Sequence, residues 1–149
     1  MKSKSTKLFE NRKAYHNFFI FDSVEAGIEL KGSEVKAIRE GKIDFTGSYV
    51  KLSPQGAEIV GMYIKPYSHA GIEVPDPRRP RRLLLHKRQL LSLFTKVQQK
   101  KMTVIPLKIY FNKKNLVKLE IALAKAKKKR DKREVLKKKQ DLREIKKAG

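Results

Sequence analysis

The pattern of apolar and polar positions is clearest in two stretches, residues 103–111 and 116–124. In both stretches apolar side chains occupy every second position. They are Ile105, Leu107 and Ile109 in the first, and Val117, Leu119, Ile121 and Leu123 in the second. A period of two predicts β-strands with one face toward the core and one toward solvent, as in antiparallel sheets.

Two other segments have the period of a helix. Residues 86–100 place Leu90, Leu93, Phe94 and Val97 at spacings of three and four, which predicts one buried stripe. Residues 33–40 predict a shorter helix, with Ser33 as its N-cap.

Further strands are predicted by aromatic and β-branched residues between turn signals. They cover residues 15–22, 24–30, 47–53 and 57–64, and Pro54-Gln55-Gly56 forms the turn between the last two. Gly27 indicates a bulge or a close approach within its strand. The fold class we predict is mainly β, an OB-type antiparallel barrel with two or three short flanking helices.

The barrel domain is expected over residues 14–124, after a flexible N-terminal arm at residues 1–13. Residues 125–149 hold 13 Lys and Arg against 4 Asp and Glu, and they have too few apolar residues to bury a core. We expect this basic tail to be disordered when free and helical only when its charge is neutralised.

The whole chain carries a formal net charge of +22, so the tail is not the only basic part. Such an excess repels itself and favours a polyanionic partner. The tail lacks Trp and Phe, and no apolar run reaches membrane-spanning length, so a membrane is the weaker candidate. Nucleic acid is the partner we predict.

The sequence gives little support to catalysis or metal binding. There is no Cys, and the three His lie on different predicted elements. We therefore expect no enzyme, cofactor or metal, although an RNA-cleaving enzyme using His16 or His86 is an alternative. The N-terminal segment lacks the apolar region of a secretory signal, which favours a cytoplasmic protein.

Several residues are candidate RNA contacts from their types alone. Arg81 belongs to the arginine cluster of residues 78–82, where guanidinium groups could bind phosphates. Tyr67 follows a proline in a loop and could stack on a base, and Lys36 and Arg39 share an outward helix face. For Glu25, spacing alone favours a structural carboxylate over an acceptor for a base edge.

Eight motifs in chain order resemble the SmpB family of tmRNA-binding proteins, also called SsrA-binding proteins. The matching residues are 11–16 (NRKAYH), 25–39 (EAGIELKGSEVKAIR), 48–50 (SYV), 66–67 (PY), 81–87 (RRLLLHK), 104–107 (VIPL), 122–125 (ALAK) and 131–133 (DKR). Each motif is weak alone, but together they cover nearly the whole chain.

The resemblance implies a non-catalytic adaptor that binds the tRNA-like domain of tmRNA and delivers it to stalled ribosomes, with the elongation factor EF-Tu as escort. We expect it to act as a monomer. The RNA-binding residues that the resemblance implies are Asn11, Lys13, His16, Glu25, Leu85, His86, Lys87, Lys125, Lys127 and Lys128.

The resemblance also implies that the tail enters the decoding centre of the small ribosomal subunit and the empty mRNA path. There it would fold as a helix against ribosomal RNA. The residues assigned to this contact are Arg130, Asp131, Lys132, Arg133, Lys137, Lys138 and Lys139.

Two departures from the family pattern affect the start of the tail. Ala126 stands where Gly is usual, which predicts a stiffer hinge. Arg130 stands where the family tends to have Tyr or His, although a guanidinium can also stack on a base. A ribosomal protein or general RNA chaperone would explain the charge and the barrel equally well, but not the order of the motifs.

Overall fold

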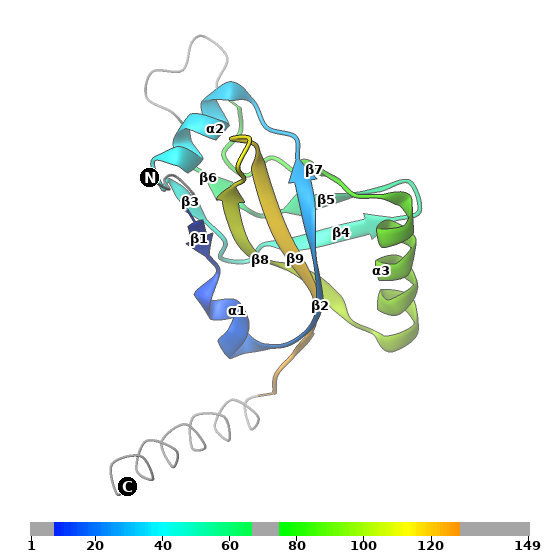
Figure 1. The fold of residues 1–149 in the computed structure, drawn as a ribbon. Helices are drawn as coiled ribbons and strands as arrows, with labels where there is room; N and C mark the ends of the chain where they lie inside the picture. Colours follow the sequence, from blue (N-terminus) through cyan, green and yellow to red (C-terminus); the bar gives the residue numbers. More distant parts are fainter. Residues whose placement is uncertain (1–7, 67–74, 129–149) are drawn as a thin grey trace, which may run out of the picture.

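The computed structural model describes residues 8–66 and 75–128. Within these ranges the chain forms nine strands and three helices (Figure 1). In chain order they are β1 (Leu8–Glu10), α1 (Arg12–Asn17), β2 (Phe18–Ile28), α2 (Gly32–Arg39), β3 (Ile43–Asp44), β4 (Tyr49–Ser53), β5 (Gly56–Val60), β6 (Tyr63–Ile64), β7 (Arg81–Leu84), α3 (Lys87–Lys100), β8 (Thr103–Phe111) and β9 (Val117–Ala126).

Seven strands form one antiparallel sheet in the order β1-β8-β4-β5-β7-β2-β9, and β9 also pairs with β8. This extra pairing closes the sheet on itself, so its apolar faces enclose one core. The short strands β3 and β6 form a separate pair. The predicted OB-type antiparallel barrel with flanking helices is confirmed.

In β9 the predicted alternation holds only from Val117 to Ile121, because residues 121–124 are all buried and Ala122 and Ala124 pack in a second core. In β8 the predicted simple alternation is wrong, since consecutive residues 104–107 are all buried. The β8–β9 register shifts between Pro106 and Lys108. Residue 105 before the shift and residue 107 within it pack in this smaller second core with Ala14 of α1. A bulge thus lets β8 serve two cores.

The predicted N-terminal arm is wrong for residues 8–13. Leu8–Glu10 pairs with β8, and α1 begins at Arg12, so residues 15–17 are helical rather than the start of a strand. Asn11 secures this segment, because its backbone amide donates to Leu107 (2.7 Å) and its side-chain amide to Pro106 (2.8 Å). A six-residue helix is too short to show a helical period in the sequence. Residues 1–7 lie outside the described ranges.

The predicted strand over residues 57–64 is divided. Gly61 has φ of +81°, and a Cβ there would lie 2.9 Å from the backbone oxygen of Gly47. Only glycine fits both restrictions, so the chain turns at this point. β5 therefore ends at Val60, and Tyr63–Ile64 pairs with β3 instead.

The long helix was predicted one residue early and otherwise correctly. α3 runs from Lys87 to Lys100, with Leu90 and Leu93 buried. Lys96 reaches from α3 to Asp22 on β2 at 2.8 Å. At the end of the barrel, β9 extends to Ala126, which pairs with Phe18, so the strand passes the predicted domain boundary at residue 124.

In α2 the predicted N-cap is wrong. The helix begins at Gly32, and the backbone amide of Lys31 donates to the Glu34 carboxylate at 2.8 Å. Glu34, and not Ser33, therefore satisfies a free amide at the helix start. Glu34 is 3% exposed, which is unusual for a carboxylate and requires partners.

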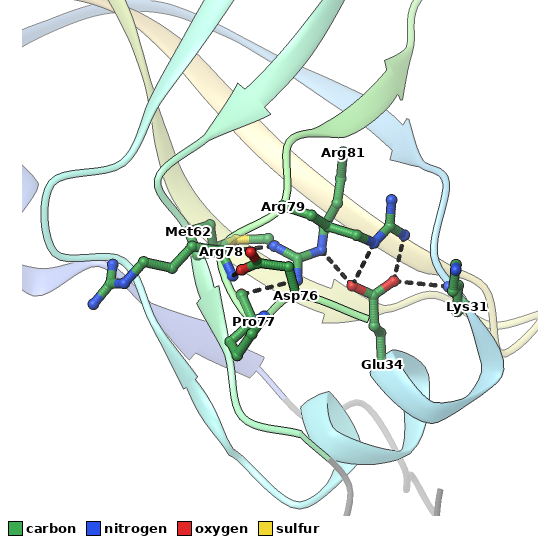
Figure 2. A network of polar contacts seen from close by, with 8 residues as sticks. All are labelled: Lys31, Glu34, Met62, Asp76, Pro77, Arg78, Arg79 and Arg81. Carbon is green, nitrogen blue, oxygen red and sulfur yellow. Dashed lines mark hydrogen bonds and ion pairs between the residues drawn. The ribbon is translucent and has the colours of Figure 1, made fainter. Parts of the chain in front are cut away.

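Those partners are two arginines from the loop before β7 and from β7 itself (Figure 2). Arg79 donates from Nε to Glu34 at 3.0 Å, and Arg81 donates from Nε at 2.7 Å. The other nitrogens of Arg81 donate to the carbonyls of Met62 (2.8 Å) and Pro77 (3.0 Å). One buried carboxylate thus joins α2 to β7.

This network corrects the prediction that Arg81 contacts RNA. Its side chain is 0% exposed, and protein oxygens occupy its three guanidinium nitrogens. Arg79 is committed to the same carboxylate, and Arg78 donates to Gly61 at 3.3 Å beside the Tyr63 ring. The cluster was recognised in the sequence, but most of it holds the fold together.

We predict that Glu34→Ala lowers the free energy of unfolding by about 3–5 kcal/mol, because it leaves the buried Arg81 without an anionic partner. Arg79→Ala is the matched control, and its 27% exposed side chain should cost about 1 kcal/mol or less. Urea denaturation measures both. Equal, small losses in the two variants would show that the buried ion pair does not carry this part of the fold.

The same carboxylate gives a pH dependence. Burial alone raises the pKa of Glu34, but hydrogen bonds from Arg79, the Lys31 amide and Arg81 outweigh burial and place the pKa below its ordinary value of 4.5. A lowered pKa means that the associated stability is complete above pH 4.5 and is lost as the pH falls through the folded-state pKa.

We therefore expect the difference in unfolding free energy between the wild type and Glu34→Gln to be constant above pH 4.5 and to shrink below it. Denaturant titrations at stepped pH measure this difference. Other carboxylates contribute equally to both proteins and cancel. A difference that does not change between pH 5 and pH 2.5 would contradict the assignment.

Candidate RNA-binding surface

A hollow of about 620 Å³ lies between β2, β5, β7 and the start of α3. Three predicted RNA-binding residues line it, namely Glu25, Leu85 and His86. Lys87, the first residue of α3, follows His86 directly, and Lys118 of β9 adds another cation to the wall. The fold thus brings one part of the predicted set into a single groove, which we call the β7–α3 groove.

Glu25 has a defined orientation in this groove. The Tyr110 hydroxyl on β8 donates a hydrogen bond to its carboxylate, across the intervening strand β9. Burial, together with the hydrogen bond to Glu25 and its charge, raises the pKa of Tyr110 far above its ordinary value, so the hydroxyl remains a donor. Glu25 itself is exposed. It can therefore accept a further hydrogen bond from a ligand.

Gly27 shapes the same groove. It pairs with Leu84 of β7, and a Cβ at Gly27 would lie 3.2 Å from the Leu84 Cβ. The predicted close approach is confirmed here, whereas the register irregularity of β2 falls between Ile20 and Ser23. A side chain at position 27 would displace Leu84 and change the groove wall.

A second group of predicted residues gathers where β9 ends beside α1. Lys127 donates from its backbone amide to Asn17 (2.9 Å) and from its ammonium to the Tyr15 carbonyl (3.1 Å). Its ammonium also lies 5.2 Å from the centre of the Phe19 ring. Lys127 thus ties the end of the barrel to α1. The exposed predicted residues around this junction are Lys13, His16, Lys125 and Lys128.

Asn11 belongs to the same end of the molecule, but its side-chain amide is used by the Pro106 carbonyl. Lys36 and Arg39 form a third group on α2. The Arg39 guanidinium lies 4.5 Å from the Phe111 ring centre, next to the turn that leads into β9. α2 therefore lies near the start of β9, whereas α1 lies near its end. The predicted residues form three groups rather than one site.

Other predicted residues cannot be placed. Tyr67 and the tail residues from Arg130 to Lys139 lie outside the described ranges, so the stacking and tail predictions stay predictions. Ala126 is the last residue of β9 and is extended. Any hinge into the tail therefore begins after it.

The geometry offers no support for hydrolysis. His16 on α1 and His86 before α3 are both exposed and lie on separate elements, and the carboxylate of Glu25 faces Tyr110. Within residues 8–66 and 75–128, no group of three or more metal-ligating side chains comes together. No helix in that part of the chain is long and apolar enough to cross a membrane.

Sequence reasoning missed two features of the β7–α3 groove. Alternation places Tyr110 on the outer face of β8, but its partner on β2 depends on the register of three strands. Arg82 also lines the groove, whereas the sequence favoured its neighbour Arg81. Alternation along a strand shows that Arg81 and Arg82 point to opposite faces of β7. It does not show which of the two points inward until the inner face of β7 is known.

Comparison with known proteins places this chain in a family. Residues 8–149 match the model of the SmpB protein family. The SsrA-binding protein of Lawsonia intracellularis is 48% identical over 145 residues, which cover 97% of this chain and 93% of that protein. The SsrA-binding protein of Persephonella marina is 51% identical over 137 residues, covering 92% and 90% respectively.

A solved structure gives the same answer for the fold. It is described as "tmRNA-SmpB: a journey to the center of the bacterial ribosome" and superimposes with a TM-score of 0.70 at 44% identity. The match covers 87% of this chain and 94% of that one. With matching motifs, sequence and barrel, the chain belongs to the SmpB protein family.

Proposed function

We propose that this chain is a non-catalytic RNA-binding adaptor of trans-translation. It binds the tRNA-like domain of tmRNA and brings it to stalled ribosomes in the cytoplasm. Support comes from family membership, from relatives named SsrA-binding proteins, and from a structural relative described with tmRNA and the ribosome.

One observation carries the proposal, namely an exposed carboxylate held in place within a basic groove. Lys and Arg bind any phosphate and so provide affinity without selectivity. Glu25 repels phosphate, so it contributes to binding only when it accepts a hydrogen bond from a donor on the RNA. Tyr110 holds the carboxylate in one orientation, which restricts the donors that fit. Glu25 therefore selects among RNAs that the cations alone would accept.

We assign separate binding roles to the remaining predicted residues. The cations where β9 meets α1 continue the RNA contact toward the tail. Lys36 and Arg39 contact RNA from α2, near the start of β9. The basic tail after the barrel enters the decoding centre and the empty mRNA path, where ribosomal RNA neutralises it and a helix forms. EF-Tu escorts the complex, and the protein acts as a monomer. Chemical steps belong to the ribosome and the aminoacylating enzyme.

The first test concerns selectivity. Glu25→Gln should weaken binding to the tRNA-like domain about 10-fold or more, because a charged acceptor is lost. Tyr110→Phe should weaken it less, about fivefold, since the carboxylate remains but is no longer held. Fluorescence anisotropy measures both affinities, with an unrelated structured RNA of equal length as competitor.

Tyr63→Phe provides the control, because this tyrosine contacts Arg78 through its ring. Its affinity should equal that of the wild type. If wild-type protein bound both RNAs equally, the chain would be a general RNA chaperone. If Glu25→Gln kept full selectivity, Glu25 would have no role in recognition.

The second test separates the barrel from the tail. A protein ending at Arg130 should retain affinity for the tRNA-like domain within about threefold at physiological salt, because the barrel keeps its contacts. Tagging of nascent peptides in a reconstituted translation system should be abolished. An affinity loss as large as the loss of tagging would contradict the proposed division.

A further inference from the structure

Arg82 is the one arginine of the 78–82 cluster whose guanidinium lacks a partner in the part of the chain that the structure describes, although Arg78 is also exposed. The side chains of the other three have partners, as described above, and Arg81 points inward. Arg82 points to the opposite face of β7 and is exposed. Among the described residues its side chain has no hydrogen-bond or ion-pair partner. Its position follows directly from the burial of Arg81, because strand neighbours alternate.

Two further charged residues lie beside Arg82 in a row across three strands. Glu58 of β5 pairs with Arg82, and Lys51 of β4 pairs with Glu58. Lys51 is exposed and its ammonium, like the Arg82 guanidinium, has no side-chain partner within the described ranges. Strand spacing places the Cα atoms of Lys51 and Arg82 about 10 Å apart, with the Cα atom of Glu58 between them.

This row lies along a second hollow of about 520 Å³, lined by Lys51, Ser53, Glu58 and Arg82. Gln55, Gly56, Ala57 and Arg82 line both this hollow and the β7–α3 groove. A Cβ at Gly56 would meet nothing within 4 Å, so the shared floor is open. The two hollows are therefore continuous through these four residues, so an RNA strand in the groove has a path into the second hollow.

The chemistry of the row matches a ribose–phosphate backbone. Two unpaired cations can each bind a phosphate, and a carboxylate between them can accept a hydrogen bond from a ribose 2′-hydroxyl. If the row had a purely structural role, we would expect an ion pair between Glu58 and one of the two cations. No such ion pair joins Glu58 to Lys51 or Arg82 in the described part of the chain.

We infer that the Lys51–Glu58–Arg82 row extends the RNA-binding surface beyond the β7–α3 groove. Lys51 and Arg82 bind successive phosphates of the RNA strand that occupies the groove, and Glu58 accepts a hydrogen bond from the ribose between them. This inference rests on the proposed RNA-binding function. It adds Lys51 and Glu58, which no motif included, and it selects Arg82 within the arginine cluster.

The test is the salt dependence of binding to the tRNA-like domain. Each lost phosphate contact lowers the slope of log K against log salt concentration by about 0.7–0.9. Arg82→Gln and Lys51→Gln should each show this decrease, and Arg82→Lys should restore most of it because the charge is kept. Lys114→Gln is the matched control. Lys114 lies in the β8–β9 turn, outside both hollows but beside α2 in Figure 1, so the variant should lower the slope by less than Arg82→Gln or Lys51→Gln does.

Glu58→Ala adds an outcome of opposite sign. If Glu58 accepts a hydrogen bond from a ribose hydroxyl, Glu58→Ala should weaken RNA binding about threefold to tenfold. If Glu58 only repels phosphate, the variant should bind RNA more strongly, and that result would overturn the proposed role of Glu58. Unchanged slopes for Arg82→Gln and Lys51→Gln, or a change equal to that of Lys114→Gln, would overturn the phosphate contacts. Wild-type protein that binds no better to the tRNA-like domain than to unrelated RNA would refute the proposed function instead. Urea denaturation of each exposed-site variant verifies that the fold is intact.

Discussion

The buried Glu34 carboxylate is the contact on which the RNA-facing surface depends. It satisfies the start of α2 and holds Arg79 and Arg81, so it fixes which face of β7 points inward. Once Arg81 is inside, Arg82 and Leu84 must point outward, where both line the β7–α3 groove. An internal ion pair thus sets the chemistry of an external surface. Such pairs contribute to placement more reliably than to net stability.

The charge distribution separates two uses of cations. Some cations form hydrogen bonds within the protein. Arg79, Arg81 and Lys127 donate to protein oxygens. Others, such as Arg82 and Lys51, remain exposed beside hollows. The net charge of +22 describes both classes together, so it indicates a polyanionic partner but not the residues that meet it. Only the pairing of donors and acceptors in the folded chain separates them.

We propose that carboxylates give this basic surface its selectivity. Glu25 is held by Tyr110, and Glu58 lies between two cations, so both positions disfavour indiscriminate phosphate binding. A carboxylate becomes favourable only where the ligand offers a donor, such as a base edge or a ribose hydroxyl. In this proposal the two acids restrict where an RNA strand can lie, while the surrounding cations attract it from a distance.

The sequence by itself determined the barrel class, the long helix and most strands, because apolar periodicity reports local burial directly. It also determined the family, through motifs that follow the chain. Tertiary structure decided the bulge in β8, the helix α1, the division at Gly61, and the choice between Arg81 and Arg82. Each of these depends on contacts between residues far apart in the chain, and no local pattern encodes which partner a side chain will meet.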